Sequence, residues 1–99
     1  GDFKRLQEEQ EVFAADLVRA RDAGVKSGSE EAEALVERHR ASIAQWYDVT
    51  PARQLILARM YVGDPRFHEA YNGAQDYLLE LVTAHAAAEG VDVDNPQWG

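Results

Sequence analysis

The side chains that most often carry catalysis are few and scattered in this sequence. Serine occurs only as Ser27, Ser29 and Ser42, and none of them lies in the Gly-x-Ser-x-Gly turn that exposes a nucleophile. Cysteine is absent, which excludes thiolate nucleophiles, thiolate metal sites and disulfides. Pairs of carboxylates arise by chance on such acidic helices, so they argue for no reaction. We therefore expect the chain not to be an enzyme.

Three histidines could bind a metal or a ligand. His39, His68 and His85 are far apart, and no His-x-x-x-His or Glu-x-x-His pair occurs, so we expect no metal and no cofactor. His39 differs from the other two because it lies in line with Leu35 and Ile43 on an apolar helix face. Two interpretations of His39 remain open: a core histidine hydrogen-bonded to a neighbouring helix, or a polar contact in a ligand pocket.

Aromatic residues gather in the middle of the chain. Six of the nine lie between positions 46 and 77, namely Trp46, Tyr47, Tyr61, Phe67, Tyr71 and Tyr77. Rings with a polar tip near helix ends suit the wall of an apolar pocket that has a few polar groups. The same rings also suit the core of a small domain, so the pattern alone leaves both interpretations open.

The first segment that must position these residues has one narrow apolar stripe. Phe3, Leu6, Phe13 and Leu17 recur at helical spacing, and Gln10 interrupts the stripe. A helix with such a narrow stripe needs a partner surface, so we expect it to be among the least stable segments of the domain. A bulky ligand between this helix and the aromatic residues would supply that surface.

A second helix is predicted after the loop at residues 24–29. Gly24 can end the first helix, and Ser27 followed by Glu30 matches a capping box that opens the second. One face of this helix carries an apolar and aromatic set: Ala32, Leu35, Val36, His39, Ile43, Trp46 and Tyr47.

Three further helices follow. Thr50-Pro51 and Asp64-Pro65 each combine a capping side chain with proline at the first helical position. Residues 55–62 are almost all apolar, which predicts a central helix buried on most sides. Asn72-Gly73 marks a break before the last helix, which ends at Gly90. No segment alternates with a period of two, so we predict an all-α fold: one domain of about five helices over residues 1–90, followed by an acidic tail over 91–99.

Size and charge narrow the functions that the chain can have. Ninety-nine residues make one domain, with room for one core and one modest pocket. The net charge of −8 opposes binding to phosphate backbones and anionic lipid. No apolar run approaches the roughly 20 residues that span a bilayer, and no signal core opens the chain. We expect no membrane contact and a cytoplasmic location, and the initial Gly without Met indicates a piece of something longer.

Two runs of sequence are distinctive as a pair. Residues 39–51 read His-Arg-Ala-Ser-Ile-Ala-Gln-Trp-Tyr-Asp-Val-Thr-Pro, and residues 58–67 read Ala-Arg-Met-Tyr-Val-Gly-Asp-Pro-Arg-Phe. These runs resemble the TipAS antibiotic-recognition family, the C-terminal effector domain of a class of MerR-type transcription regulators. A weaker likeness extends from about Leu6 to Ala88.

The resemblance implies a globin-like helical domain that encloses bulky, often peptidic antibiotics. In full-length relatives a winged helix-turn-helix and a long dimerising helix come first, and this sequence contains neither. DNA would then be contacted only through that N-terminal domain. The full-length regulator would be a dimer and this chain by itself a monomer. Drug binding would be read out as altered promoter geometry and activated transcription.

The resemblance also places a ligand-binding site. The pocket would be formed by seven residues: His39 as a polar contact, Trp46, Tyr47, Val49, Tyr61 and Phe67 as its wall, and Met60 as a flexible apolar contact. Tyr71 would pack behind Phe67 and support the wall.

Two departures from the family pattern bear on the ligand. Val49 stands where family members commonly carry cysteine, and Ser42 stands where an aromatic residue is common. The first removes the thiol for covalent capture of a dehydroamino acid, so we expect reversible binding of a thiopeptide-like or other bulky peptidic drug.

One alternative function belongs to a different class. The chain would then be a protein–protein interaction module whose apolar groove takes a partner helix, its own first helix included. A partner helix needs a continuous apolar stripe, whereas a drug needs a closed pocket.

Overall fold

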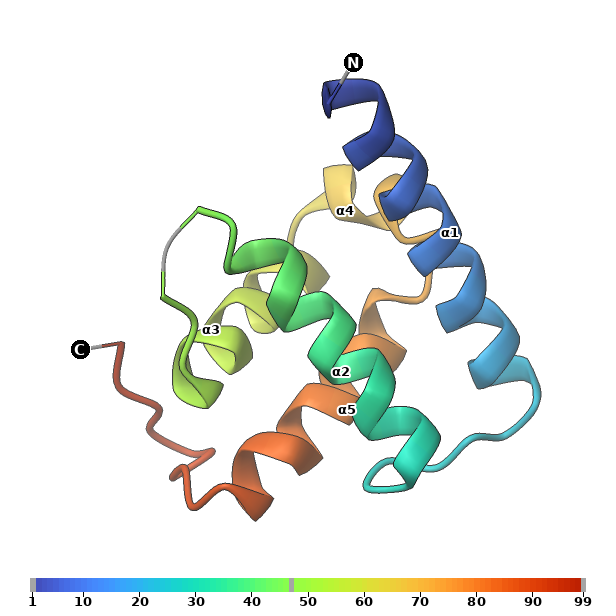
Figure 1. The fold of residues 1–99 in the computed structure, drawn as a ribbon. Helices are drawn as coiled ribbons and strands as arrows, with labels where there is room; N and C mark the ends of the chain where they lie inside the picture. Colours follow the sequence, from blue (N-terminus) through green and yellow to red (C-terminus); the bar gives the residue numbers. More distant parts are fainter. Residues whose placement is uncertain (1, 47, 99) are drawn as a thin grey trace.

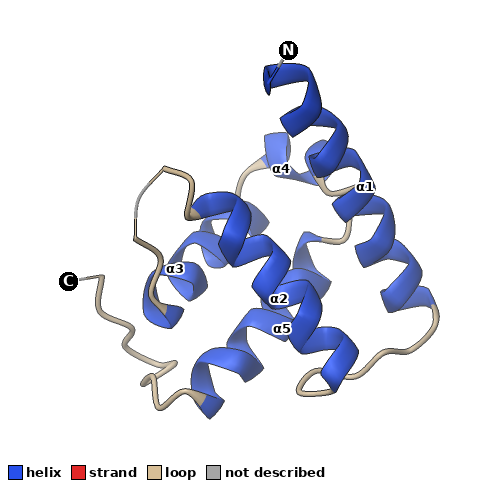
Figure 2. Cartoon of the chain, in the orientation of Figure 1, coloured by secondary structure: helices blue, strands red, loops and turns tan. Residues whose placement is uncertain are grey.

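The computed structural model describes residues 2–46 and 48–98, in which the chain forms five α-helices and no strand (Figures 1 and 2). This confirms the predicted all-α fold. The helices are α1 (Asp2–Asp22), α2 (Glu30–Ile43), α3 (Pro51–Val62), α4 (Pro65–Ala70) and α5 (Gln75–Ala88). In the described part of the chain, no helix is both long and apolar enough to cross a membrane.

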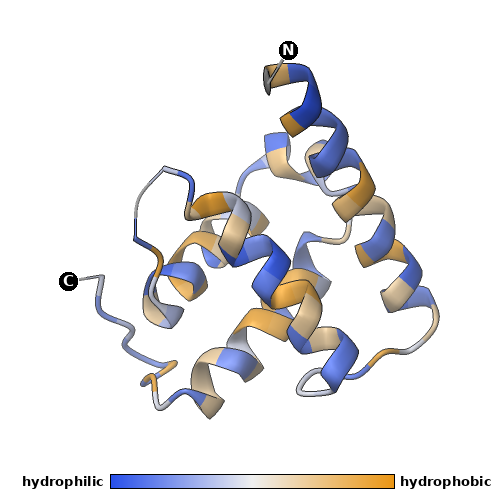
Figure 3. Cartoon of the chain, viewed as in Figure 1, coloured by the Kyte–Doolittle hydropathy of each residue, from blue (hydrophilic) through white to orange (hydrophobic). Residues whose placement is uncertain are grey.

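The core lies where α2, α3 and α5 meet. The most extensive contact between helices is that of α3 with α5, and α2 packs across α5 (Figure 1). Apolar residues are concentrated at that crossing (Figure 3). Val36, Leu55, Leu78 and Val82 are almost fully buried there, and Leu17 of α1 belongs to the same buried cluster. Removal of such side chains from water supplies most of the stability of a small domain.

The helix starts that carry proline were predicted correctly. The Thr50 hydroxyl accepts a hydrogen bond from the Arg53 backbone N–H at 3.1 Å, and Asp64 accepts one from the Arg66 N–H at 3.0 Å. Both capping residues have extended backbone, which is the conformation that an N-cap requires. These signals are local in sequence, so they do not depend on tertiary packing.

The predicted cap of α2 was wrong by two residues. Ser29, not Ser27, accepts the hydrogen bond from the Ala32 N–H, at 3.2 Å. Gly28 has a left-handed φ of +82°, which turns the chain so that Ser29 enters the helix with extended backbone. The serine hydroxyl also donates to the Lys26 carbonyl oxygen at 2.7 Å.

The prediction that residues 55–62 are buried on most sides was also wrong. Leu55 and Ala58 are buried, but Met60 is 61% exposed and Val62 also faces solvent in part. Because a chain this short has few helices with which to surround another, α3 buries one face.

The segment after α5 lies along α3 rather than free in solvent. Val91 and Val93 pack against the core. The Arg53 guanidinium donates to the Trp98 carbonyl oxygen at 2.7 Å and lies 5.2 Å from the centre of the Trp98 ring, and Arg59 donates to the Val93 carbonyl oxygen. The division of the chain at residue 90 stays a prediction.

α1 is buried along only half of its length. Phe13 and Leu17 belong to the core, whereas Phe3 is 82% exposed and Val12 is also exposed. The N-terminal turns of α1 project beyond the other helices in Figure 1. Gln10, which interrupts the apolar stripe, donates to the Ala70 carbonyl oxygen at the end of α4, at 3.4 Å.

The uneven burial of α1 predicts uneven hydrogen exchange. Local opening of residues 3–9 exposes little core, so their amides should exchange about 100-fold or more faster than those of residues 77–82 in α5. Native-state hydrogen exchange followed by NMR measures both. Equal protection of the two segments would contradict the prediction, since it would mean that α1 opens only when the whole domain unfolds.

Candidate functional site

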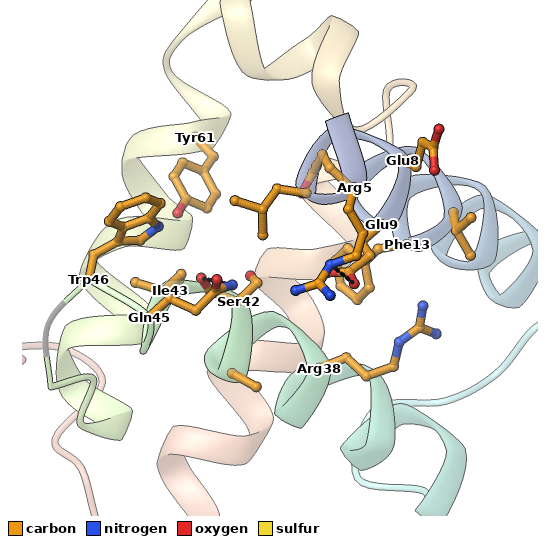
Figure 4. Close-up of a pocket in the computed structure, with 14 residues that line it drawn as sticks. Arg5, Glu8, Glu9, Phe13, Arg38, Ser42, Ile43, Gln45, Trp46 and Tyr61 are labelled. Carbon is orange, nitrogen blue, oxygen red and sulfur yellow. Dashed lines mark hydrogen bonds and ion pairs between the residues drawn. The ribbon is translucent and has the colours of Figure 1, made fainter. Parts of the chain in front are cut away.

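A cleft of about 820 Å³ opens between the N-terminal half of α1, the C-terminal end of α2 and Tyr61 of α3 (Figure 4). Its lining consists of Arg5, Leu6, Glu8, Glu9, Gln10, Val12, Phe13, Arg38, Ala41, Ser42, Ile43, Gln45, Trp46 and Tyr61. The cleft therefore lies between the first helix and part of the aromatic cluster.

Aromatic rings form two opposite sides of the cleft. Trp46 and Tyr61 stand on one side and Phe13 on the other, with Ile43 and Ser42 from the end of α2 between them (Figure 4). Trp46 is 73% exposed, since α2 ends at Ile43 and the chain turns there. A large exposed indole beside two largely buried rings is a surface that an apolar ligand can cover.

The charged residues of the lining are Arg5, Arg38, Glu8 and Glu9, and both arginines have a carboxylate partner. Arg5 and Glu9 on α1 form an ion pair at 3.8 Å. Arg38 donates to Asp16 at 2.9 Å, and its guanidinium lies 5.2 Å from the centre of the Phe13 ring. Because these cations already have partners, the cleft is suited to a neutral ligand rather than to a phosphate or another strong anion.

Further aromatic rings support Tyr61 from behind. The ring centres of Tyr61 and Phe67 lie 4.3 Å apart, and Phe67 stacks on Tyr71 at 6.3 Å. Burial raises the pKa of the Tyr71 hydroxyl, which also hydrogen-bonds with Tyr61 and Gln10. The position of the Tyr61 ring in the cleft is therefore fixed by packing with α4 and the residue that follows it.

His39 lies directly behind the cleft. It is 1% exposed, and its ring contacts Phe13 at 6.1 Å and Tyr61 at 5.7 Å between ring centres. Its Nδ1 atom lies 2.9 Å from the amide nitrogen of Gln54 on α3. Burial lowers the pKa of His39 from 6.5 to about 4, so the imidazole is neutral at pH 7. His39 is thus buried and bonded to a neighbouring helix, and its membership of the ligand site stays a prediction.

The other predicted site residues fall in three places. Trp46 and Tyr61 line the cleft, and Phe67 lies one layer behind. Val49 is 8% exposed and Met60 points to solvent, and neither belongs to the lining. Tyr47 lies outside the described residues.

The sequence predicted that a ligand could lie between the first helix and the aromatic residues, but it named no residue of that helix as part of the site. Leu6, Gln10 and Phe13 line the cleft, whereas the sequence placed Leu6 and Phe13 in the apolar stripe of the first helix and Gln10 at its interruption. The signal in the sequence was the narrow apolar stripe, which needs a partner surface. Only the packing of α1 beside the end of α2 shows which residues of α1 face the cleft.

The comparisons with known proteins agree with the resemblance seen in residues 39–67. A family model described as the TipAS antibiotic-recognition domain matches residues 1–93, which include all five helices. No curated protein and no solved structure matches the chain. The family resemblance is thus confirmed, and the globin-like arrangement that it implies stays a prediction.

The buried imidazole predicts how stability depends on pH. The pKa of His39 is lower in the folded chain, about 4, than its ordinary value of 6.5, so the unfolded chain binds the extra proton. Stability should therefore fall as pH drops from 6.5 towards 4, by about 2 kcal/mol between pH 7 and pH 5. Urea unfolding at both pH values measures this difference. His39→Gln should be less stable but should lose most of the dependence, and an unchanged dependence in this variant would refute the assignment.

Proposed function

Since this chain belongs to the TipAS antibiotic-recognition family, we propose that it is the ligand-sensing domain of a MerR-type transcription activator. The observation that carries the proposal is the cleft of about 820 Å³ between α1 and α2, within the residues that the family model matches. Small-molecule sites commonly have volumes of about 300–1,000 Å³. The cleft has the size of such a site, and its aromatic side chains and balanced charges suit a bulky peptidic antibiotic.

Trp46 and Tyr61 contact the ligand in this proposal, with Phe13 opposite them. Phe67 acts through Tyr61, because the two rings are in contact at 4.3 Å between centres. Val49 and Met60 remain proposed members of the site, which they would reach only if the loop before α3 or the end of α3 moved. Tyr47 stays a member by its position next to Trp46 in the sequence.

Binding is reversible in this proposal, because the sequence has no cysteine that could add to a dehydroamino acid. The domain senses its ligand in the cytoplasm, and DNA is contacted by another part of a dimeric regulator, since the net charge of −8 opposes contact with phosphates. Family membership supports ligand binding rather than catalysis as the role of the fold.

A thermal-shift screen tests the proposal. The domain is heated with each member of an antibiotic library that includes thiopeptides. A ligand at about 100 times its dissociation constant stabilises the fold by about 2.7 kcal/mol, which raises the melting temperature of a domain this size by about 10 °C or more. An amphipathic helical peptide serves as the comparison, because the alternative function predicts that it binds instead. Stabilisation by the peptide and by no antibiotic would overturn the proposal.

The two tryptophans provide a matched pair for locating the site. Trp46→Ala should weaken binding of an antibiotic found in the screen by about 30-fold, because truncation of an aromatic contact commonly costs 2 kcal/mol or more. Trp98→Ala should change affinity by less than about threefold, since Trp98 contacts Arg53 and does not line the cleft. Calorimetric titration measures both. Equal losses would place part of the binding surface on the segment after α5.

A further inference from the structure

The hydrogen bonds between α2 and α3 determine the tautomer of His39. The amide nitrogen of Gln54 lies 3.0 Å from the Val36 carbonyl oxygen and 2.9 Å from His39 Nδ1. It has two N–H groups and donates one to each. An amide oxygen in its place would face the Val36 oxygen, which is also an acceptor. Nδ1 is therefore an acceptor, and neutral His39 carries its proton on Nε2.

That Nε2–H group has no hydrogen-bond acceptor among the residues that the structure describes. The Oε1 atom of Gln54 likewise has no donor there. Both side chains are almost completely buried, at 1% and 0% exposed. Buried polar groups in proteins are nearly always paired, because an unpaired one has lost its bonds to water. An unpaired donor of this kind therefore calls for an explanation.

The position of the imidazole behind the cleft offers an explanation for this unpaired donor. Phe13 and Tyr61 each line the cleft and each contact the His39 ring. Phe13 comes from α1, which packs less extensively against the other helices than α3 and α5 pack against each other. A displacement of α1 that moved Phe13 away would uncover the His39 ring and leave the contact between α3 and α5 in place.

We propose that the cleft has an inner subsite in which the Nε2–H group of His39 donates a hydrogen bond to a carbonyl oxygen of the ligand, after Phe13 moves aside. The inference rests on the proposed ligand-binding cleft and adds the chemistry that the ligand must carry there. A neutral donor in apolar surroundings selects a neutral acceptor, such as the oxygen of a peptide amide, over an apolar group of the same shape.

The first experiment uses the free domain. A ¹⁵N–¹H correlation spectrum of the imidazole ring distinguishes the two neutral tautomers and the charged form. We expect the Nε2–H tautomer at pH 7, with Nδ1 as the acceptor from Gln54. An Nδ1–H tautomer or an imidazolium would overturn the proposal, because neither leaves a neutral Nε2–H donor.

The second experiment uses two probes of nearly the same shape. Acetophenone carries a carbonyl oxygen, and α-methylstyrene has a CH₂ group in its place. Acetophenone should shift the Nε2–H resonance of His39 downfield, and α-methylstyrene should not. If both probes shift the Trp46 indole resonance while His39 is unchanged, or if neither probe shifts either resonance, the inner subsite does not exist.

A double variant provides the control for the affinities. His39→Phe with Gln54→Leu removes both polar partners together, which leaves no unpaired group of the pair and preserves the packing. The affinity of acetophenone relative to that of α-methylstyrene should fall about fivefold in the double variant, and an unchanged ratio would refute the hydrogen bond. The two proposals can fail separately. If no antibiotic stabilises the domain but His39 responds to acetophenone as expected, the proposed function is refuted and the subsite is retained.

Discussion

The hydrogen bond between His39 and Gln54 joins α2 to α3 inside the core, and the shape of the cleft depends on it. A buried polar side chain loses its bonds to water, so each of these residues constrains where the other can lie. Once the imidazole is fixed, Phe13, Tyr61 and Tyr71 pack around it at ring-centre distances of 5.7 to 6.4 Å. Phe13 and Tyr61 also form part of the aromatic sides of the cleft. The core and the candidate site thus share one set of contacts.

The short chain explains why the cleft lies at one edge of the molecule. Five helices bury one face of α3 and the C-terminal half of α1, and the N-terminal half of α1 extends past them (Figure 1). Leu6 and Phe13 then face Trp46 and Tyr61 across space that no helix of the described chain fills. A ligand that occupied this space would bury apolar surface on both sides, so binding and the ordering of α1 are favoured by the same contacts.

Local signals in the sequence predicted most of the fold, and tertiary packing determined the rest. The caps at Thr50 and Asp64 were found because a capping side chain and a proline stand next to each other. The start of α2 was misplaced because the left-handed turn at Gly28 is not visible in the spacing of serines. Of the site residues, Trp46 and Tyr61 followed from the family resemblance, whereas Phe13 could not, since its place in the cleft depends on how α1 packs. The buried state of His39 was one of two interpretations that periodicity alone could not separate.

The paired charges of the cleft and its few fixed polar groups contribute differently to the choice of ligand. The cleft lining contains the cations Arg5 and Arg38 and the carboxylates Glu8 and Glu9, so its charges balance. Both arginines have a carboxylate partner, at 3.8 Å between Arg5 and Glu9 and at 2.9 Å between Arg38 and Asp16. A neutral, bulky ligand meets little electrostatic preference in such a cleft. Discrimination among such ligands must then come from shape and from the few polar groups that are fixed in place. Because a misplaced polar group loses its bonds to water and gains none in return, even one fixed donor can separate ligands of equal size.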